Sequence, residues 1–351
     1  MRPDRRSATQ HSTSAGGDQA LATQSGFNKV VSAPSLWDRM RSVNVQQVAL
    51  IIVIATIALF MQINFPRYLS RANIEVMLVN FVTEGIMALG MTVVMITGGI
   101  DISVAAVLQL SAIVVGMLMN AGVVMPLAIV LTLVVAAAIG WINASVTNIC
   151  KVHPFIVTLA SLLTLRGVSL VITKGTTVTG FPQAFAFLGR GKILEIRVSL
   201  ILFVVLAVVI GYALKNHRYF QQAYFIGGHR RSARMSGINI ERFIVFTFML
   251  SAVLAGIAGI VICSQYGAAS VSYGQNAELR VIAATAIGGA SLTGGTGTIF
   301  GTTLGVIFLA MVYNAFNMTG VNTYWQDVAI GVMLLVAVFL GEYLKRRRLT
   351  H

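Results

Sequence analysis

Long apolar runs alternate with short polar or basic segments along most of this 351-residue chain. A helix that crosses a bilayer needs about 20 predominantly apolar residues. The pattern predicts ten such segments, over residues 45–63, 74–97, 102–119, 123–145, 154–173, 198–214, 241–263, 279–291, 298–317 and 326–343. The third and eighth either cross fully or re-enter. We therefore predict an all-α fold, a polytopic transmembrane helical bundle of about ten spans with glycine-broken or re-entrant helices.

The polar segments divide the chain into three parts. Residues 1–44 are rich in Ser, Thr, Gln and Gly, a composition typical of a disordered tail. Residues 45–345 form the predicted transmembrane domain, which includes a polar loop at 215–240, and residues 346–351 form a short tail. The loop at about 174–197 lies on the other side of the membrane from the 215–240 loop and is predicted to form a periplasmic cap.

Charge supports this assignment and orients it. The chain is 56% hydrophobic and 10% charged, whereas a soluble domain carries about 25% charged residues. The net charge of +14 comes from Lys and Arg before the first apolar run, in the central loop and at 345–348. This is the positive-inside pattern, so ten crossings place both termini in the cytoplasm. It also argues against nucleic acid as a partner.

No metal or nucleotide site is predicted. Cys150 and Cys263 have no partners at metal-ligand spacing, and the five histidines are scattered. The stretch 289–296, GASLTGGT, has glycines at a spacing like that of a phosphate-binding loop, but Gly295 stands where the loop needs lysine. If ATP drives this protein, the ATPase is a different chain.

Two glycine-rich segments indicate a weak internal repeat. Residues 88–113 and 282–310 both read as apolar helix, glycine-rich break, apolar helix. Corresponding breaks in two halves of a membrane protein point to a transport pathway. Alternatively, the glycines serve only to let helices pack closely, an interpretation that suits Gly301 and Gly305 well.

The first break contains the most informative polar residues. Thr97, Gly98 and Gly99 interrupt an apolar stretch, and unwound backbone at membrane depth must be surrounded by protein or a cavity. Asp101, followed by Ser103, has the pattern of a helix N-cap. A role in the pathway and a capping role are both compatible with this pattern.

Three further polar residues lie inside predicted spans. Glu84 shares a helix face with Asn80, and its carboxylate either makes a hydrogen bond within the bundle or marks a functional site. Gln109 is placed to reach a polar substrate. Arg166 either pairs with a carboxylate or lies near the membrane edge.

The segment 227–239 reads as a short helix closed by glycine. Such a helix between two spans can dock in a groove of a partner protein. A solvated basic loop is the alternative.

Four ordered motifs resemble the membrane subunits of ribose-, xylose- and arabinose-type ATP-binding-cassette importers. They are GMTVVMITGGIDISVAAVLQLSA (90–112), HPFIVTLASLLTLRGVSLVITKG (153–175), GGHRRSARMSGIN (227–239) and ELRVIAATAIGGASLTGGTGTIFGTTLG (278–305). The resemblance covers roughly residues 45–345. The chain departs from the family pattern at Ala105 and Ala106, at His153, and at His229, Arg230 and Arg231, where the added positive charge implies a more acidic groove on the partner.

The resemblance implies a permease subunit of the bacterial inner membrane that imports a monosaccharide or related sugar and has no catalytic site or cofactor of its own. Its implied partners are a cytoplasmic ABC ATPase that binds ATP and Mg, a periplasmic sugar-binding protein, a second permease subunit, identical or homologous, and membrane lipid. The implied coupling residues are Gly227, Gly228, His229, Arg230, Ala233, Arg234, Ser236, Gly237, Ile238 and Asn239. The predicted pathway residues are Glu84, Thr97, Gly98, Gly99, Asp101, Ser103, Gln109, Phe155, Gly288, Gly289, Ser291, Gly294 and Gly295.

Two other functions compete with this one. An ion- or proton-coupled secondary transporter would also use broken helices, with Glu84 or Asp101 as its ion site. A cassette permease for branched-chain amino acids would have a similar layout, although the TGGIDIS and GGASLTGG runs argue against it. The sequence does not select among sugars.

Overall fold

The structure is a computed structural model that describes residues 45–322 and 324–349. The predicted tail at 1–44 lies outside the described residues. The described helices are α3 (Val45–Asn64), α4 (Arg71–Ile96), α5 (Val104–Asn120), α6 (Met125–Cys150), α7 (Pro154–Thr173), η1 (Gln183–Phe185), α8 (Ala186–Arg190), α9 (Val198–Asn216), α10 (Arg218–Gly228), α11 (Arg230–Met235), α12 (Ile240–Tyr266), α13 (Ala277–Ile287), α14 (Ile299–Thr319) and α15 (Tyr324–Leu349).

Strands make up very little of the described chain. β1 (Val178–Thr179) pairs antiparallel with β4 (Ala268–Ala269), and β2 (Lys192–Ile193) pairs antiparallel with β3 (Ile196–Arg197). The all-α fold class is confirmed. The segment 174–197, predicted to form a cap, contains β1, β2, β3, η1 and α8.

Each of the ten predicted spans coincides with a helix, but the helices differ in length. Seven described helices are long and apolar enough to cross a membrane: α3, α4, α6, α7, α9, α12 and α14. α5 has 17 residues and α13 has 11. At 1.5 Å per residue α13 is about 16 Å long, about half the thickness of a bilayer core. A count of ten full crossings therefore remains a prediction.

Two helices form the centre of the bundle. Within their most apolar windows, 83% of the residues of α4 and 67% of those of α12 are buried, whereas the corresponding share is 11% for α3 and 17% for α7. α12 packs against α4, α5 and α6. The outer helices carry exposed apolar side chains such as Leu163 and Val208, as expected of a surface solvated by lipid.

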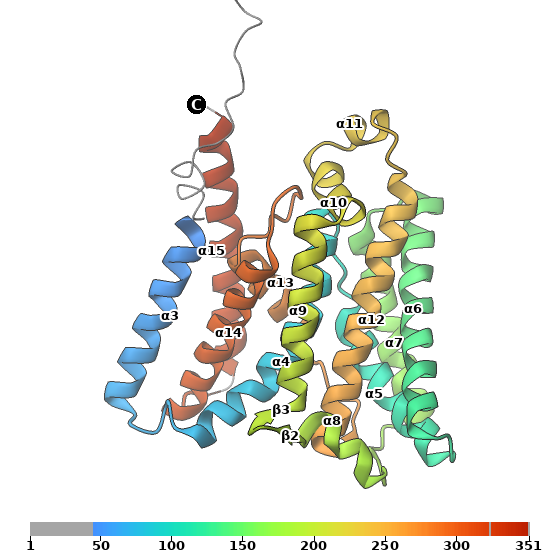
Figure 1. Ribbon diagram of the computed structural model, residues 1–351, viewed down its shortest axis with the longest axis vertical. Helices are drawn as coiled ribbons and strands as arrows, with labels where there is room; N and C mark the ends of the chain where they lie inside the picture. Colours follow the sequence, from blue (N-terminus) through green and yellow to red (C-terminus); the bar gives the residue numbers. More distant parts are fainter. Residues whose placement is uncertain (1–44, 323, 350–351) are drawn as a thin grey trace, which may run out of the picture. The chain divides into compact units, whose positions relative to one another are not determined.

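The described helices run back and forth between two ends of the bundle (Figure 1). We call one the break end: it holds the start of α3, the segments 97–103 and 288–298, α10 and α11. We call the other the hairpin end: it holds the segments 64–70, 174–197 and 267–276. α15 ends at Leu349, so residues 346–349 of the predicted tail continue this helix.

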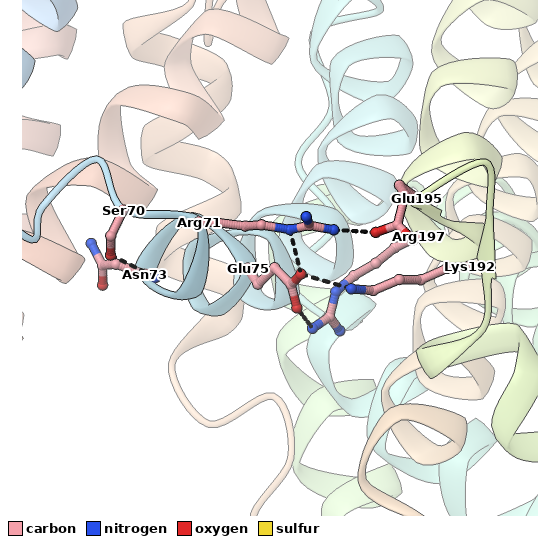
Figure 2. A network of polar contacts seen from close by, with 7 residues as sticks. All are labelled: Ser70, Arg71, Asn73, Glu75, Lys192, Glu195 and Arg197. Atoms are coloured by element: carbon pink, nitrogen blue, oxygen red, sulfur yellow. Dashed lines mark hydrogen bonds and ion pairs between the residues drawn. The ribbon is translucent and has the colours of Figure 1, made fainter.

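Side-chain charges hold the hairpin end together (Figure 2). Glu75, in the first turns of α4, accepts from Lys192 at 2.8 Å and from Arg197 at 2.9 Å, the two residues lying on β2 and β3. Arg71 pairs with Glu195, which lies between these strands. The β2–β3 hairpin is thereby fixed to the start of α4.

Candidate functional site

The first glycine-rich break separates α4 from α5. α4 ends at Ile96, and Gly98 follows in the left-handed region with φ 80°. The N–H of Gly99 donates to the carbonyl of Val94 at 3.1 Å. A left-handed glycine just after the last helical residues is a common way to end a helix. The predicted interruption at 97–103 is therefore present.

The second break separates α13 from α14. Four of its glycines have positive φ: Gly289 (100°), Gly294 (89°), Gly295 (82°) and Gly297 (154°). The next helix begins cleanly, because the Thr298 hydroxyl accepts the N–H of Gly301 at 3.0 Å and caps α14. The two halves of the predicted repeat thus share the order helix, break, helix.

The two breaks meet each other and the end of α10. The N–H of Gly295 donates to the carbonyl of Ile96 at 2.8 Å. A Cβ atom added to Gly227 would lie 1.8 Å from that same carbonyl oxygen. One added to Gly294 would lie 2.9 Å from the Gly227 Cα and 2.9 Å from the Gly98 nitrogen. Three distant segments therefore touch through backbone atoms that only glycine allows to approach so closely.

The start of α3 is attached to the second break. The Gln46 amide donates to the carbonyl of Ile287 at 3.1 Å, and the Gln47 amide donates to the Thr298 hydroxyl at 2.8 Å. Gly288 and Gly289, the remaining glycines of the predicted pathway, lie beside these contacts. A Cβ on Gly288 would lie 2.3 Å from Gly301 O, and one on Gly289 would lie 3.3 Å from Gln46 Oε1.

Asp101 lies at the centre of a buried polar cluster. Its side chain accepts from the Ser103 N–H at 3.1 Å, the Ser103 hydroxyl at 2.6 Å and the Ser251 hydroxyl at 3.1 Å. The Asn143 amide donates to the Ser103 hydroxyl at 3.0 Å. These bonds tie the first break to α6 and α12. Asp101 is 1% exposed, and it makes no ion pair with any described residue.

The N-cap assignment of Asp101 needs correction. α5 begins at Val104, and its N-cap position is occupied by Ser103, whose side chain makes no capping bond. Asp101 instead binds the N–H of Ser103, two residues along the chain, so it stabilises the turn before the helix.

Two ion pairs hold α13 on opposite sides. Glu84 of α4 accepts from Arg280 at 2.5 Å, and Arg166 of α7 pairs with Glu278 at 3.1 Å. Arg280 also lies over the ring of Tyr313 on α14, 5.6 Å from its centroid. Glu84 therefore has a partner within the bundle, and Arg166 pairs with a carboxylate, one of the two alternatives that the sequence left open.

Two predicted pathway residues, Gln109 and Phe155, lie in helices outside the two breaks, and Ser291 lies within the second break, where its carbonyl accepts the N–H of Gly294 at 3.1 Å. Gln109 is buried in α5 at 2% exposed, and Phe155 is 42% exposed in the first turn of α7. The hydroxyl of Ser291 lies 2.9 Å from that of Thr293.

The predicted coupling segment is divided between two helices. Gly227 and Gly228 end α10, so the single short helix predicted from 227 is limited to α11 (Arg230–Met235). His229 Nδ1 accepts the N–H of Ser232 at 3.3 Å, which caps α11. Gly237, at φ 80°, closes it. The other predicted coupling residues lie in α11 or just after it: Ala233, Arg234, Ser236, Ile238 and Asn239.

A cavity of about 980 Å³ opens beside this segment at the break end. Thr97, Gly98 and Thr293 of the two breaks line it, together with the loop between α6 and α7 and the residues around α11. Its charged lining residues are Lys151, Arg230, Arg231, Arg234 and Glu241. The cavity thus connects the glycine contact with the coupling segment.

Several residues of this site escaped the sequence-based prediction. Ser251 and Asn143 complete the Asp101 cluster, and Arg280 neutralises Glu84. Two sequence signals could have found them. Asn143 is a polar amide inside a predicted span, and Arg280 is a basic residue in the short eighth apolar segment, where a buried charge needs a partner.

Residues 73–338 match the family described as branched-chain amino acid transport system / permease component. The chain belongs to this family. The ribose import permease protein RbsC of Bacillus subtilis (strain 168) is 36% identical over 279 residues, which cover 79% of this chain and 87% of the relative. No solved structure matches this chain.

Further relatives of this permease family carry other sugar names. The D-allose transport system permease protein AlsC of Escherichia coli (strain K12) is 33% identical, over 83% of this chain and 89% of its own. The xylose transport system permease protein XylH of Haemophilus influenzae is 31% identical, over 88% of this chain and 99% of its own. The resemblance drawn from the four motifs is confirmed.

Proposed function

We propose that this chain is the permease subunit of an ATP-binding-cassette importer that carries a monosaccharide or a related small polar sugar across the inner membrane. Its relatives by name carry ribose, allose and xylose. The permease and membrane-protein character of the chain follow from its family and from the seven helices of the described residues that are long and apolar enough to cross a membrane. Which sugar it carries is a matter for uptake measurements.

The proposal includes partners that supply energy and substrate. A cytoplasmic ATPase would hold ATP and Mg, a periplasmic binding protein would deliver the sugar, and a second permease subunit would complete the pathway. The break end, with its basic segments, would face the cytoplasm, and the hairpin end would face the periplasm. Both termini would then be cytoplasmic.

One observation supports the coupling role above the others. α11 is exposed at Arg230, Arg231 and Met235, and α10 directly precedes it. The end of α10 touches the first break at Ile96 and the second at Gly294 and Gly295. A displacement of α11 by the ATPase would therefore reach both breaks through one short rigid helix.

A secondary transporter needs a carboxylate that is free to bind an ion or proton within the membrane, and both predicted candidates already have partners. Glu84 is paired with Arg280, and Asp101 already accepts three hydrogen bonds, from the N–H and hydroxyl of Ser103 and the hydroxyl of Ser251. We therefore do not favour ion coupling. The amino acid permease alternative is disfavoured because the ribose, allose and xylose permeases named above are 31% to 36% identical to this chain.

Gly237→Val tests the coupling role. The residue has φ 80° and no atom lies within 4 Å of an added Cβ, so the change distorts only the turn that closes α11. We expect normal amounts of protein in the membrane, ATP hydrolysis by the assembled complex, and strongly reduced uptake of labelled ribose or xylose.

The matched control is Gly175→Val at the hairpin end. Gly175 has φ 71° and equally open surroundings, so its intrinsic backbone cost is the same. Uptake should be nearly normal in this variant. Equal uptake by the Gly237 and Gly175 variants would refute the coupling assignment.

A further inference from the structure

The cavity at the break end carries more positive charge than the fold neutralises. Arg234 pairs with Glu241 at 2.5 Å. Lys151, Arg230 and Arg231 also line the cavity, and none of them makes an ion pair with a described residue. Cations of the same sign gathered around one concave space raise the local concentration of anions.

These cations come from two separate places in the fold. Lys151 lies between α6 and α7, whereas Arg230 and Arg231 lie on α11. A ligand bound to both would connect the loop between two outer helices with the coupling segment. The first turn of α7, at His153 and Pro154, also lines the cavity, and the positive end of that helix dipole favours an anion there.

The remaining lining describes the rest of the ligand. The cavity, at about 980 Å³, is at the upper end of the range for small-molecule sites and far larger than one inorganic ion needs. Guanidinium groups such as those of Arg230 and Arg231 match phosphate oxygens in pairs. Thr147 and Asn148 also line the cavity. Their side chains donate to the backbone carbonyls of Asn143 and Glu241, so toward a hydroxylated ligand their side-chain oxygens act as acceptors.

We propose that this cavity binds a phosphate-bearing, polyhydroxylated molecule, with its phosphate on Lys151, Arg230 and Arg231. A soluble sugar phosphate and the headgroup of phosphatidylglycerol share this chemistry. An acidic side chain of a partner protein would neutralise the cations but would leave most of the space unfilled. Because the ligand would join α11 to the loop between α6 and α7, its occupancy would restrict the coupling segment. This regulatory consequence rests on the proposed function, whereas binding itself does not.

Binding can be measured on the purified full-length chain without any transport step. Isothermal calorimetry in neutral detergent would use ribose 5-phosphate and ribose as a matched pair of soluble probes. Native mass spectrometry from phosphatidylcholine nanodiscs, with and without phosphatidylglycerol, would test the lipid source. We expect saturable binding of ribose 5-phosphate or retention of phosphatidylglycerol, no binding of ribose at this site, and weaker binding at high salt.

The double variant Arg230→Gln/Arg231→Gln should weaken binding about tenfold or more, because charge-assisted bonds to phosphate are lost. The control is Arg218→Gln/Arg242→Gln, which removes two cations of the same cytoplasmic region that do not line the cavity. This control should bind like the unchanged protein.

The outcomes separate clearly. Binding of the soluble probe alone assigns the site to a metabolite, and retention of the lipid alone assigns it to the membrane. Absence of both, or equal affinity in the two double variants, overturns the proposal. These binding results are independent of the uptake measured for Gly237→Val. Failure of the cavity proposal is therefore distinguishable from failure of the proposed importer function.

Discussion

The two ends of the bundle are held together by different kinds of contact. At the hairpin end, Lys192 and Arg197 bind Glu75 through long side chains, and short strands pair beside them. At the break end, Gly227 and Gly295 meet the carbonyl of Ile96 directly through backbone atoms.

This difference has a mechanical consequence. A long side chain can change rotamer and keep its ion pair when the helices around it shift slightly. Two backbones in direct contact have no such freedom, because packed protein interiors are nearly incompressible. The hairpin end is therefore suited to anchor the bundle, and the break end is suited to transmit displacement from α10 to both breaks.

Gly227→Ala should have the largest effect, since it tests this contact at its tightest point. The new methyl group would lie 1.8 Å from Ile96 O, and relieving that overlap requires backbone movement. We expect destabilisation above about 3 kcal/mol and loss of uptake, measured by membrane yield, thermal unfolding and sugar uptake.

The neighbouring residue provides the control for this prediction. Gly228→Ala places its methyl group where no atom lies within 4 Å, so yield and uptake should stay near normal. Normal function of both alanine variants would show that the backbone contact at 227 does not constrain the breaks.

Asp101→Leu should cause the second largest loss of stability and uptake. The change leaves the Ser251 hydroxyl and the N–H and hydroxyl of Ser103 without their acceptor, and each buried unpaired group costs about 1–3 kcal/mol. Asp101→Asn keeps one acceptor oxygen and should lose much less. Thermal unfolding and uptake of the two variants check the order, and equal behaviour of Leu and Asn would remove the polar cluster from the explanation.

Glu84→Gln should come third, because it leaves Arg280 uncompensated while that side chain is only 20% exposed. Breaking such a pair costs about 3 kcal/mol. The double variant Glu84→Gln/Arg280→Gln should recover part of the loss, and a double-mutant cycle measured by thermal unfolding gives the coupling.

The exposed pair Arg234–Glu241 is the comparison for that cycle, since its side chains are 68% and 54% exposed. Its coupling should stay below about 1 kcal/mol. If the exposed pair coupled more strongly than Glu84 with Arg280, burial would not explain the difference between them.

Glu75→Gln should have the smallest effect. Glu75 is 29% exposed, compared with 12% for Glu84, and Lys192 is 36% exposed and can be hydrated when the carboxylate is lost. Arg197, at 17% exposed, keeps the amide oxygen of the new glutamine as an acceptor. We expect a slight decrease in melting temperature that shrinks as salt is raised, with uptake retained. A complete loss of uptake would mean that the hairpin end takes part in transport and does not merely anchor the bundle.

The helices and the breaks could be predicted from the sequence because they depend on local features. Long apolar runs located the helices, and the glycines near 98 and 294 located the interruptions. Contacts between distant segments left no comparable trace. The sequence alone could not indicate that Gly227 faces Ile96, or that Glu84 pairs with a residue 196 positions away.

The error at Asp101 has a specific cause. The sequence pattern of a cap is the same whether the aspartate binds the second or third N–H of a helix or binds a turn just before it. The structure selects the turn, because Ser251 and Asn143 hold the carboxylate and Ser103 in place from α12 and α6. Thr158 of α7 also binds this turn, accepting the N–H of Ile102 at 3.2 Å, so contacts from three other helices fix the residues just before α5.

The ion pairs of α13 also bear on how the protein is made. With 11 residues that include Glu278 and Arg280, α13 is too short and too charged to enter the bilayer as an independent helix. Arg166 and Glu84, which neutralise it, lie on α7 and α4 and are synthesised earlier. We therefore expect α13 to be buried only after α4 and α7 are in place, which would make this step of assembly in the membrane sequential.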